Sequence, residues 1–430
     1  MADIKVALPY GKDTVEVIVP ERNLIGVYSP KNVSAVLDVK KEIVRALNNP
    51  IATKSLRELV AGVRKVVIVA DDNTRLTPTD KIMPVLLDSM NAAGIQDSQI
   101  TVIIALGTHR FMTDEEILIK FGKEVVRRVA IKNHDYKNHS ELVDLGTTPN
   151  GTHVMVNREA FEADFKIGLG SIVPHHIPGF AGGAKIVQPG ICGEDTTAET
   201  HLLSVRAPRS YLGVMDNPVR TELNSIARSV GLNTILNTVL NRNGDVVKAF
   251  FGDVVDAFNE GVKLSKSVYS LAIPEEADIV LSSSHPCDLE FWQAHKTLYP
   301  SDLAVKQGGI IIVVTPCYEG VAMTHGDILE VTHRDACNLR DMVSCKQLQD
   351  EVAAALAIAW AQVKERETVY IVSEGICGAD AKRLGFVSFP SVQEAFENAM
   401  KQKGPEARVT VLTHAPDMLP VIIEPAKNKI

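Results

Sequence analysis

Apolar runs that end in polar loops and lead into helices repeat along the first half of this chain, and this alternation constrains the fold most. Residues 66–70 (Val-Val-Ile-Val-Ala), 101–106 (Thr-Val-Ile-Ile-Ala-Leu) and 165–170 (Phe-Lys-Ile-Gly-Leu-Gly) each predict a strand. Continuous β-branched runs are typical of strands covered on both faces, as in a parallel sheet. A helix is predicted at 80–93, and a second helix begins at a capping box, 113–116. The pattern therefore predicts an α/β region.

The same alternation resumes beyond residue 270, after a probable boundary at Pro274-Glu275-Glu276. Strands are predicted at 277–281, 309–315 and 368–373, and helices at 289–307 and 391–403. A chain of 430 residues exceeds the size at which a single hydrophobic core stops growing. We therefore predict two α/β domains with mostly parallel sheets, residues 1–270 and 271–430.

A glycine-rich segment, residues 174–190, follows the third predicted strand directly. It reads Pro-His-His-Ile-Pro-Gly-Phe-Ala-Gly-Gly-Ala-Lys-Ile-Val-Gln-Pro-Gly and carries one charged side chain, Lys185, behind Gly182 and Gly183. Glycine weakens both helices and strands, so the segment is predicted to be a loop whose backbone closely approaches a binding partner. A lysine at its edge indicates that this partner is anionic or covalently held.

Polar clusters follow all three predicted strands of the first region: 71–75, 107–110 and 174–185. In an open parallel sheet, ligands bind outside the carboxyl ends of the strands. Because three loops converge where this architecture places its chemistry, we predict a functional site there.

The residue types in these clusters indicate proton transfer and anion binding. Histidine carries protons near neutral pH and binds metals, and His109, His175 and His201 all belong to the predicted site. Arg75 is interpreted as a clamp for a carboxylate or phosphate. Lys296, with Gln293 one helical turn before it, could add a charge and an amide to the same anion. Six further histidines are interpreted as surface or structural residues: His134, His139, His153, His176, His325 and His333.

Composition excludes several classes of protein. A formal charge of −8 and the lack of a Lys/Arg-rich run disfavour nucleic-acid binding. No apolar stretch is long enough to predict a membrane span, and the N-terminus lacks the apolar region of a signal peptide. Six scattered cysteines without a Cys-x-x-Cys pair favour a reducing cytoplasm and argue against a zinc ribbon or an iron–sulfur cluster.

Taken together, the clusters resemble the nickel-pincer nucleotide-dependent lactate racemases. The resemblance extends from about residue 70 to about residue 300, with the order and spacing of the motifs preserved. It is carried by Asp72-Asn73-Thr74-Arg75, Gly107-Thr108-His109-Arg110, His175, Pro-Gly-Phe-Ala-Gly-Gly-Ala-Lys185, His201 and the Gln293/Lys296 pair. Each motif alone is weak, whereas a histidine ten residues before Lys185 and another 16 residues after it form a specific combination.

This resemblance implies a fold, a cofactor and a partner. The active site would lie in the cleft between two α/β domains, with the cofactor-binding loops in residues 1–270 and further substrate-binding residues in 271–430. The cofactor would be a pyridinium mononucleotide whose thioamide, thiocarboxylate and ring carbon hold Ni(II) as a pincer, made by dedicated cofactor-synthesis proteins. Lys185 would carry it covalently and His201 would be the fourth nickel ligand, which suits a tetragonal Ni(II) site. The other residues implied to contact the cofactor are Asp72, Thr74, Gly182 and Gly183.

The implied activity is racemisation or epimerisation of a 2-hydroxy acid, with lactate as the first candidate. Hydride would pass to and from the cofactor through a 2-keto acid, while His109 and His175 would act as the two proton carriers. Arg75, Gln293 and Lys296 would bind the substrate.

Two positions depart from the expected pattern: Trp292 stands where a tyrosine is expected, and Ala181 where a serine is common. Trp292 therefore leaves open a substrate other than lactate. The residues alone also leave open a divalent-metal hydrolase or isomerase that uses Asp71, Asp72 and histidines, and a non-enzymatic sensor of nucleotides or organic acids. The oligomeric state is not indicated by the sequence.

Overall fold

A six-stranded sheet forms the first half of the molecule, in the order β13-β12-β9-β4-β5-β6. The computed structural model describes residues 3–423. Five strands are parallel and β13 joins β12 antiparallel at one edge. The bounds are β4 Val66–Asp71, β5 Ile100–Ala105, β6 Ala130–Asn133, β9 Phe165–Ser171, β12 Thr234–Leu240 and β13 Val246–Gly252.

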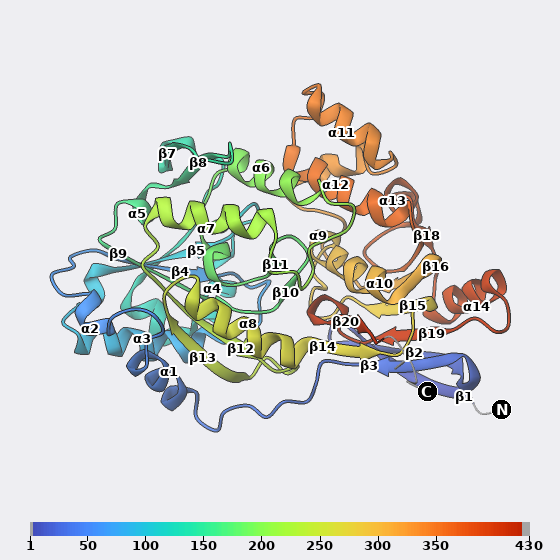
Figure 1. Cartoon of the computed structure of the whole chain (residues 1–430), viewed down its shortest axis with the longest axis horizontal. Coiled ribbons are helices and arrows are strands. Elements are labelled where there is room, and N and C mark those ends of the chain that lie inside the picture. Colours follow the sequence, from blue (N-terminus) through green and yellow to red (C-terminus); the bar gives the residue numbers. More distant parts are fainter. Residues whose placement is uncertain (1–2, 424–430) are drawn as a thin grey trace, which may run out of the picture.

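Both faces of this sheet are covered by helices, as the continuous apolar runs predict (Figure 1). Successive side chains of β4 point to opposite faces of the sheet and pack into two different hydrophobic cores. Val67 and Val69 belong to the core that contains Phe258 of α8, whereas Ile68 belongs to the core that contains Leu86 of α3. The helices of this half are α1 Val39–Asn48, α2 Leu56–Leu59, α3 Thr79–Ala92, α4 Asp114–Arg128, α5 Arg158–Phe161, α6 Glu194–Ser204, α7 Pro218–Val230 and α8 Asp256–Tyr269.

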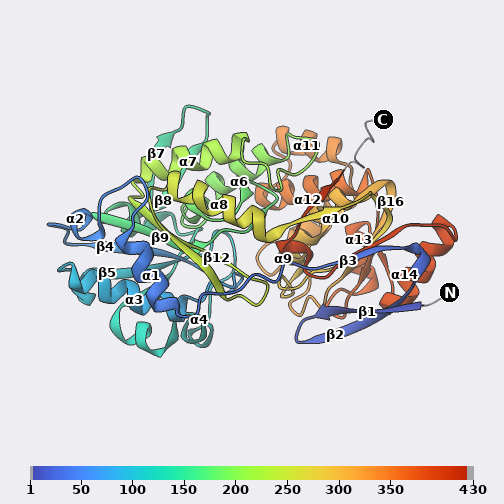
Figure 2. The ribbon, with the colours of Figure 1, turned by 60° about the horizontal axis from the view of Figure 1, so that its bottom comes forward.

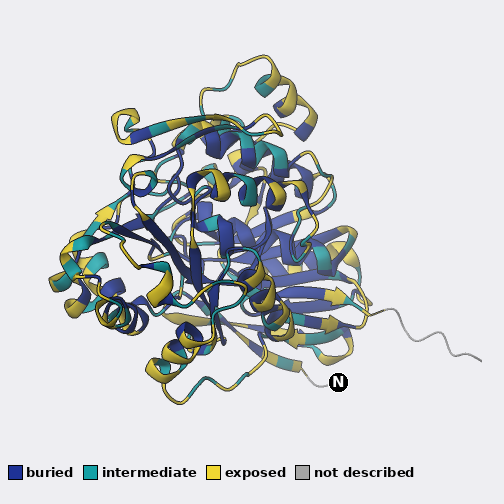
Figure 3. Ribbon diagram, turned by 60° about the vertical axis from the view of Figure 1, so that its left-hand side comes forward, coloured by how far each residue is buried: buried dark blue, intermediate teal, exposed yellow. Residues whose placement is uncertain are grey.

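A second six-stranded sheet, entirely parallel, has the order β18-β17-β16-β15-β19-β3. Its strands are β3 Leu24–Tyr28, β15 Ala277–Ser283, β16 Val305–Val314, β17 Thr368–Val372, β18 Val387–Ser388 and β19 Val409–Leu412. Its helices are α9 Phe291–Ala294, α10 Leu298–Ala304, α11 Ala336–Ser344, α12 Glu351–Lys364, α13 Gly378–Leu384 and α14 Val392–Lys403. The two sheets lie side by side (Figures 1 and 2), and their inner strands are mostly buried (Figure 3). The predicted fold of two α/β units with mostly parallel sheets is confirmed.

The N-terminal residues differ from the predicted division into 1–270 and 271–430. The hairpin of β1 (Asp3–Tyr10) and β2 (Asp13–Pro20) packs its Leu8 and Val17 with Ile279 of β15. The next strand, β3, pairs with β19 at the edge of the second sheet. Residues 3–28 therefore belong to the second unit. Pairing between strands so far apart in the chain leaves no local signal in the sequence, which explains the error.

Short pairs of strands complete the fold. β14 (Ser270–Ile273) lies parallel to β20 (Leu419–Ile422), and β7 (Leu142–Thr147) forms a hairpin with β8 (His153–Asn157). The glycine-rich segment contains a short antiparallel hairpin of two strands with two residues each, β10 (Pro174–His175) and β11 (Gly179–Phe180). Within residues 3–423, no helix is long and apolar enough to cross a lipid bilayer.

Candidate active site

One cavity lies between the two halves, where the carboxyl ends of the first sheet face α9 and the turn that follows it. Strands β4, β5 and β9 deliver the loops that begin at Asp72, Leu106 and Ile172, as expected for a parallel sheet. Of the predicted site residues, only Gly183 does not line the cavity. Those that do are Asp72, Thr74, Arg75, His109, His175, Gly182, Lys185, His201, Trp292, Gln293 and Lys296.

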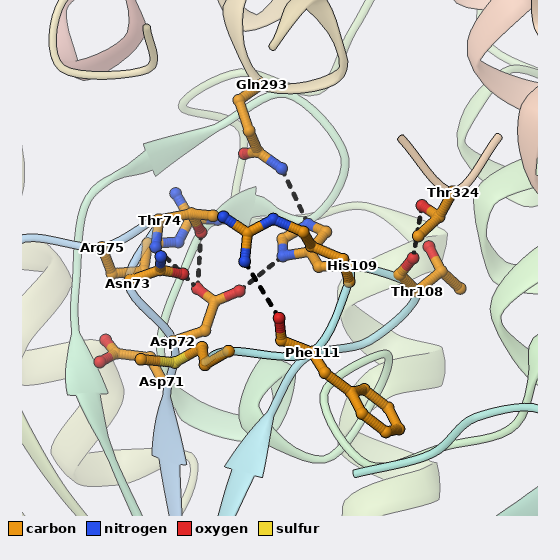
Figure 4. Close-up of polar contacts among 12 residues, drawn as sticks. Asp71, Asp72, Asn73, Thr74, Arg75, Thr108, His109, Phe111, Gln293 and Thr324 are labelled. Atoms are coloured by element: carbon orange, nitrogen blue, oxygen red, sulfur yellow. Dashed lines mark hydrogen bonds and ion pairs between the residues drawn. The ribbon is translucent and has the colours of Figure 1, made fainter. Parts of the chain in front are cut away.

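A chain of hydrogen bonds runs across the cavity and joins the two halves (Figure 4). Asp72 Oδ2 lies 2.6 Å from His109 Nδ1, and the amide nitrogen of Gln293 lies 2.8 Å from His109 Nε2. Lys296 Nζ donates to Gln293 Oε1. Asp72 also accepts from the backbone N–H (3.1 Å) and the hydroxyl (2.6 Å) of Thr74. Asp72 and Thr74, which the resemblance places at the cofactor, thus hold His109 in this structure.

The carboxylate of Asp72 is held in its charged form. Burial by itself would raise its pKa, but the ion pair with His109 and the hydrogen bond from Thr74 outweigh burial, so the pKa lies well below its usual range. Two further polar contacts join the halves near His109: Thr324 Oγ1 donates to the carbonyl of Thr108 (2.9 Å), and Arg110 pairs with Glu319 (2.9 Å). The neighbourhood of His109 is therefore fixed by both halves of the molecule.

His175 has a different environment from His109. It lies in the β10–β11 hairpin, and its Nδ1 accepts the backbone N–H of Ile177 at 3.2 Å. Its ring stacks on His176 (4.6 Å between centroids), which in turn stacks on Tyr299 (4.2 Å). Burial and the nearby charge of Lys185 lower the pKa of His175 well below its ordinary value, so the ring is neutral.

The positively charged side chains around the cavity are placed to bind an anion. Within residues 3–423, no carboxylate lies within ion-pairing distance of Arg75, whose guanidinium is therefore available to a ligand. Burial and the charge of Arg75 lower the pKa of Lys296 to about 8. Burial, together with the charges of Arg75 and Lys296, lowers the pKa of Lys185 well below its ordinary value. A lowered pKa increases the fraction of the amine in its neutral, nucleophilic form, which covalent attachment of a cofactor requires.

The glycines before Lys185 serve the packing of the loop. Gly182 and Gly183 have positive φ angles (87° and 59°). A Cβ on Gly183 would lie 2.8 Å from the ring of Phe258, and one on Gly182 would lie 2.8 Å from Ile172. The N–H of Gly183 donates to Asn237 Oδ1 (2.8 Å). In this structure the N–H of Gly183 is therefore used inside the protein, and Gly183 does not line the cavity.

Arg220 of α7, which sequence reasoning missed, holds the same loop. It donates to the carbonyls of Pro178 (3.3 Å), Phe180 and Gly182 (3.3 Å), and its guanidinium lies 4.3 Å from the ring centroid of Phe258. Asn237 of β12 was missed as well. Neither residue stands in a motif, and each reaches the loop only through the fold.

Removal of the Arg220 donors is expected to destabilise the protein. Arg220→Met keeps a similar volume but leaves buried carbonyls unpaired, and we expect a loss of at least about 2 kcal/mol. Thermal unfolding of the apo protein measures the change, with Arg228→Met at an exposed position of the same helix as the control. Equal midpoints for the two variants would contradict the role of Arg220 in holding the loop.

His201 lies on α6 with one ring nitrogen committed. Its Nδ1 donates to the carbonyl of Thr197 at 2.8 Å, which leaves the Nε2 lone pair for the cavity. Burial and the charge of Lys185 lower the pKa of His201 to about 3, so the imidazole is neutral, the form that binds metals.

The side chains around the cavity fit a metal ion that is held mainly by the donor atoms of a bound cofactor. Within residues 3–423, no three His, Cys, Asp or Glu side chains are grouped to hold a metal ion. Asp71, which a divalent-metal hydrolase would use, lies 3.0 Å from Lys120 and accepts from Thr77. A pincer that supplies three donor atoms needs one more from the protein, and His201 offers it. The residues therefore fit a lysine-linked nickel-pincer nucleotide.

Trp292 forms part of the wall of the cavity. Its indole stacks on His325 (4.0 Å between centroids, 15° between planes), and His325 Nδ1 lies 2.6 Å from Asp350 Oδ2. His325, interpreted from the sequence as a surface or structural residue, is fully buried and supports this wall. The predicted helix 289–307 spans 291–304 in the structure, as α9, a turn of 3-10 helix (His295–Thr297) and α10, and residues 305–307 already belong to β16. This helical stretch carries Trp292, Gln293 and Lys296 to the same cavity.

The fold and the cavity define a two-domain α/β enzyme whose active site lies between its domains. Residues 10–213 match the family described as lactate racemase N-terminal domain, and residues 273–423 match the lactate racemase C-terminal domain. The lactate racemase of Thermoanaerobacterium thermosaccharolyticum is 32% identical over 326 residues, 74% of this chain and 76% of that protein. The chain belongs to the lactate racemase family and is an isomerase.

Further similarities cover nearly the whole chain. The lactate racemase of Lactiplantibacillus plantarum is 29% identical over 436 residues, covering 98% of this chain and all (100%) of that protein. The structure of the lactate racemase apoprotein from Thermoanaerobacterium thermosaccharolyticum superimposes with a TM-score of 0.87 at 26% identity, over 97% of this chain and 100% of that chain. A Thermotoga maritima protein, with a TM-score of 0.72 and 21% identity over 89% of this chain and 98% of that chain, shares the fold.

Proposed function

We propose that this protein interconverts the two configurations at C2 of a 2-hydroxy acid, with lactate as the first candidate substrate. The observation that carries the proposal is the pairing of two histidines, His109 and His175, with unpaired cationic side chains in one cavity. The names of the two lactate racemases to which the chain is similar support the choice of lactate.

The chain's own residues supply binding and proton transfer. Arg75 and Lys296 bind the substrate carboxylate, because Arg75 is unpaired and Lys296 is held only by a neutral amide. One histidine takes the hydroxyl proton as C2 is oxidised, and the other returns a proton once C2 has been reduced from the opposite face. The planar 2-keto acid between these steps is what allows inversion.

A nickel-pincer pyridinium nucleotide, bound through Lys185 with His201 on the metal, would supply the hydride acceptor and donor. The lowered pKa of the Lys185 amine and the uncommitted Nε2 of His201 support this assignment. Cofactor-synthesis proteins would be the partners that provide it.

The proposed activity is tested with single-enantiomer 2-hydroxy acids and protein produced in a host that makes the cofactor. Chiral chromatography should show formation of the opposite enantiomer, and deuterium at C2 should slow the reaction because that bond is broken. Protein that carries the cofactor but racemises no acid of the panel would contradict the proposal. Zinc or manganese without a lysine adduct would instead favour the hydrolase.

Substrate choice is expected to depend on Trp292. Its indole is fixed by the stack on His325, so it forms a rigid boundary of the pocket beside Gln293. Trp292→Tyr should change the ratio of kcat/KM between small and large substrates by about tenfold or more, as 1–3 kcal/mol of side-chain discrimination would. The panel assayed on both proteins gives this ratio. Identical rankings would assign Trp292 to packing only.

A further inference from the structure

The hydrogen bonds around His109 fix which of its ring nitrogens carries the proton. Lys296 can only donate, so Gln293 must present its oxygen to Lys296 and its NH₂ group to His109. His109 Nε2 is therefore an acceptor. On the other side of the ring, ionised Asp72 can only accept, so Nδ1 carries the hydrogen. His109 is held as the Nδ1–H tautomer with its Nε2 lone pair facing the cavity.

The hydrogen bond to His175 fixes the opposite tautomer. The backbone N–H of Ile177 donates to Nδ1, so the hydrogen of the neutral His175 ring is on Nε2. Within residues 3–423, no carboxylate accepts from His175, whereas His109 has Asp72. The two histidines are therefore chemically different before any substrate binds.

We propose that Asp72 is a positioning residue that makes His109 the base of the resting enzyme, while His175 starts as a hydrogen-bond donor. This inference rests on the proposed racemase function. When substrate displaces the amide of Gln293, the hydroxyl O–H bond breaks and its proton forms a bond to His109 Nε2. The positive charge that the ring gains is offset by Asp72, at 2.6 Å from Nδ1. The Ile177 N–H opposes the same change in His175.

Asp72→Asn tests this proposal directly, because Thr74 determines the orientation of the side-chain amide in the variant. Both donors of Thr74, its N–H and its hydroxyl, bond Asp72 Oδ1. In the variant, the amide oxygen takes this place and the NH₂ group faces His109 Nδ1. That group can only donate, as can the NH₂ group of Gln293 at Nε2, so the Nδ1 hydrogen loses its acceptor and the hydrogen bonds no longer hold the lone pair on Nε2.

The tautomers are measured directly in the apo protein, labelled with ¹⁵N-histidine, by long-range proton–nitrogen NMR. His109→Gln and His175→Gln assign the two rings. We expect Nδ1–H for His109 and Nε2–H for His175, and loss of the exclusive Nδ1–H form of His109 in Asp72→Asn. The matched control is Asp144→Asn, which alters an exposed Asp–His pair with His153 and should leave both rings unchanged. The same tautomer in both wild-type rings would overturn the proposal, even if Asp72→Asn does not fold.

The second experiment measures the turnover of the cofactor-loaded enzyme. Asp72→Asn should lower kcat at least about tenfold with the cofactor content unchanged, since part of the contribution of a general base is lost. A kcat equal to that of Asp144→Asn would overturn the positioning role while the racemase function stands. A wild-type enzyme that racemises nothing would instead remove the proposed function, and the NMR arm would still decide what Asp72 does to His109.

Discussion

Lys185→Ala is expected to abolish both the covalent attachment of the cofactor and racemisation. Burial and the charges of Arg75 and Lys296 lower the pKa of the Lys185 amine, which favours its neutral, nucleophilic form. Mass spectrometry of protein from a cofactor-producing host should show an adduct on the Lys185 peptide of the wild type and none in the variant. Racemisation should fall to the background of the assay.

Lys263→Ala is the matched control, because Lys263 is exposed and pairs with Glu260 on α8. It should retain both adduct and activity. An adduct that persists in Lys185→Ala would refute the attachment site. His201→Ala separates attachment from metal binding: the adduct should remain, while nickel per protein should fall because the fourth ligand is lost.

His109→Gln and His175→Gln are each expected to lower turnover at least about 100-fold, the lower end of what a general acid–base group contributes. Glutamine keeps polar atoms in the site but cannot carry a proton between substrate and solvent. Both variants should still take up cofactor, so the loss should appear in kcat measured per loaded enzyme. The assay is the initial rate from each enantiomer.

His153→Gln, an exposed histidine with its own carboxylate partner, is the control for the substitution itself. Should either His109→Gln or His175→Gln racemise at a rate near that of this control, that histidine is not a proton carrier. The two-histidine scheme would then need another group in its place.

Six strands of the two large sheets were predicted from the sequence because each carries a local apolar run: β4, β5, β9, β15, β16 and β17. The other six strands of these sheets were not predicted, and they include the buried β12 and β19. The runs at 66–70 and 165–170 correspond to β4 and β9, in which every residue is buried. The polar loops after β4, β5 and β9 also meet as predicted, since parallel strands end at one edge. The predicted 289–307 helix was too long at its C-terminal end, where residues 305–307 begin β16, because the local sequence does not mark where the helix stops.

The partnerships inside the site could not be predicted from the sequence. Asp72 and His109 are 37 residues apart on loops after neighbouring strands, and only the pairing of β4 with β5 brings them together. Arg220 and Asn237 are ordinary residues of a helix and a strand, and their contacts with the glycine-rich loop depend on the packing of α7 and β12. Local patterns identify the candidates, whereas tertiary contacts decide what each one does.

The return of the N-terminal strand to the second sheet has a mechanical consequence. The chain passes between the domains twice, once between β3 and α1 and again where α8 leads directly into β14. Two connections resist twisting and sliding of one domain against the other more than a single linker does. Relative motion of the domains is therefore limited mainly to rotation about the line that joins the two connections. The path of the chain thus limits how far Gln293 can move away from His109.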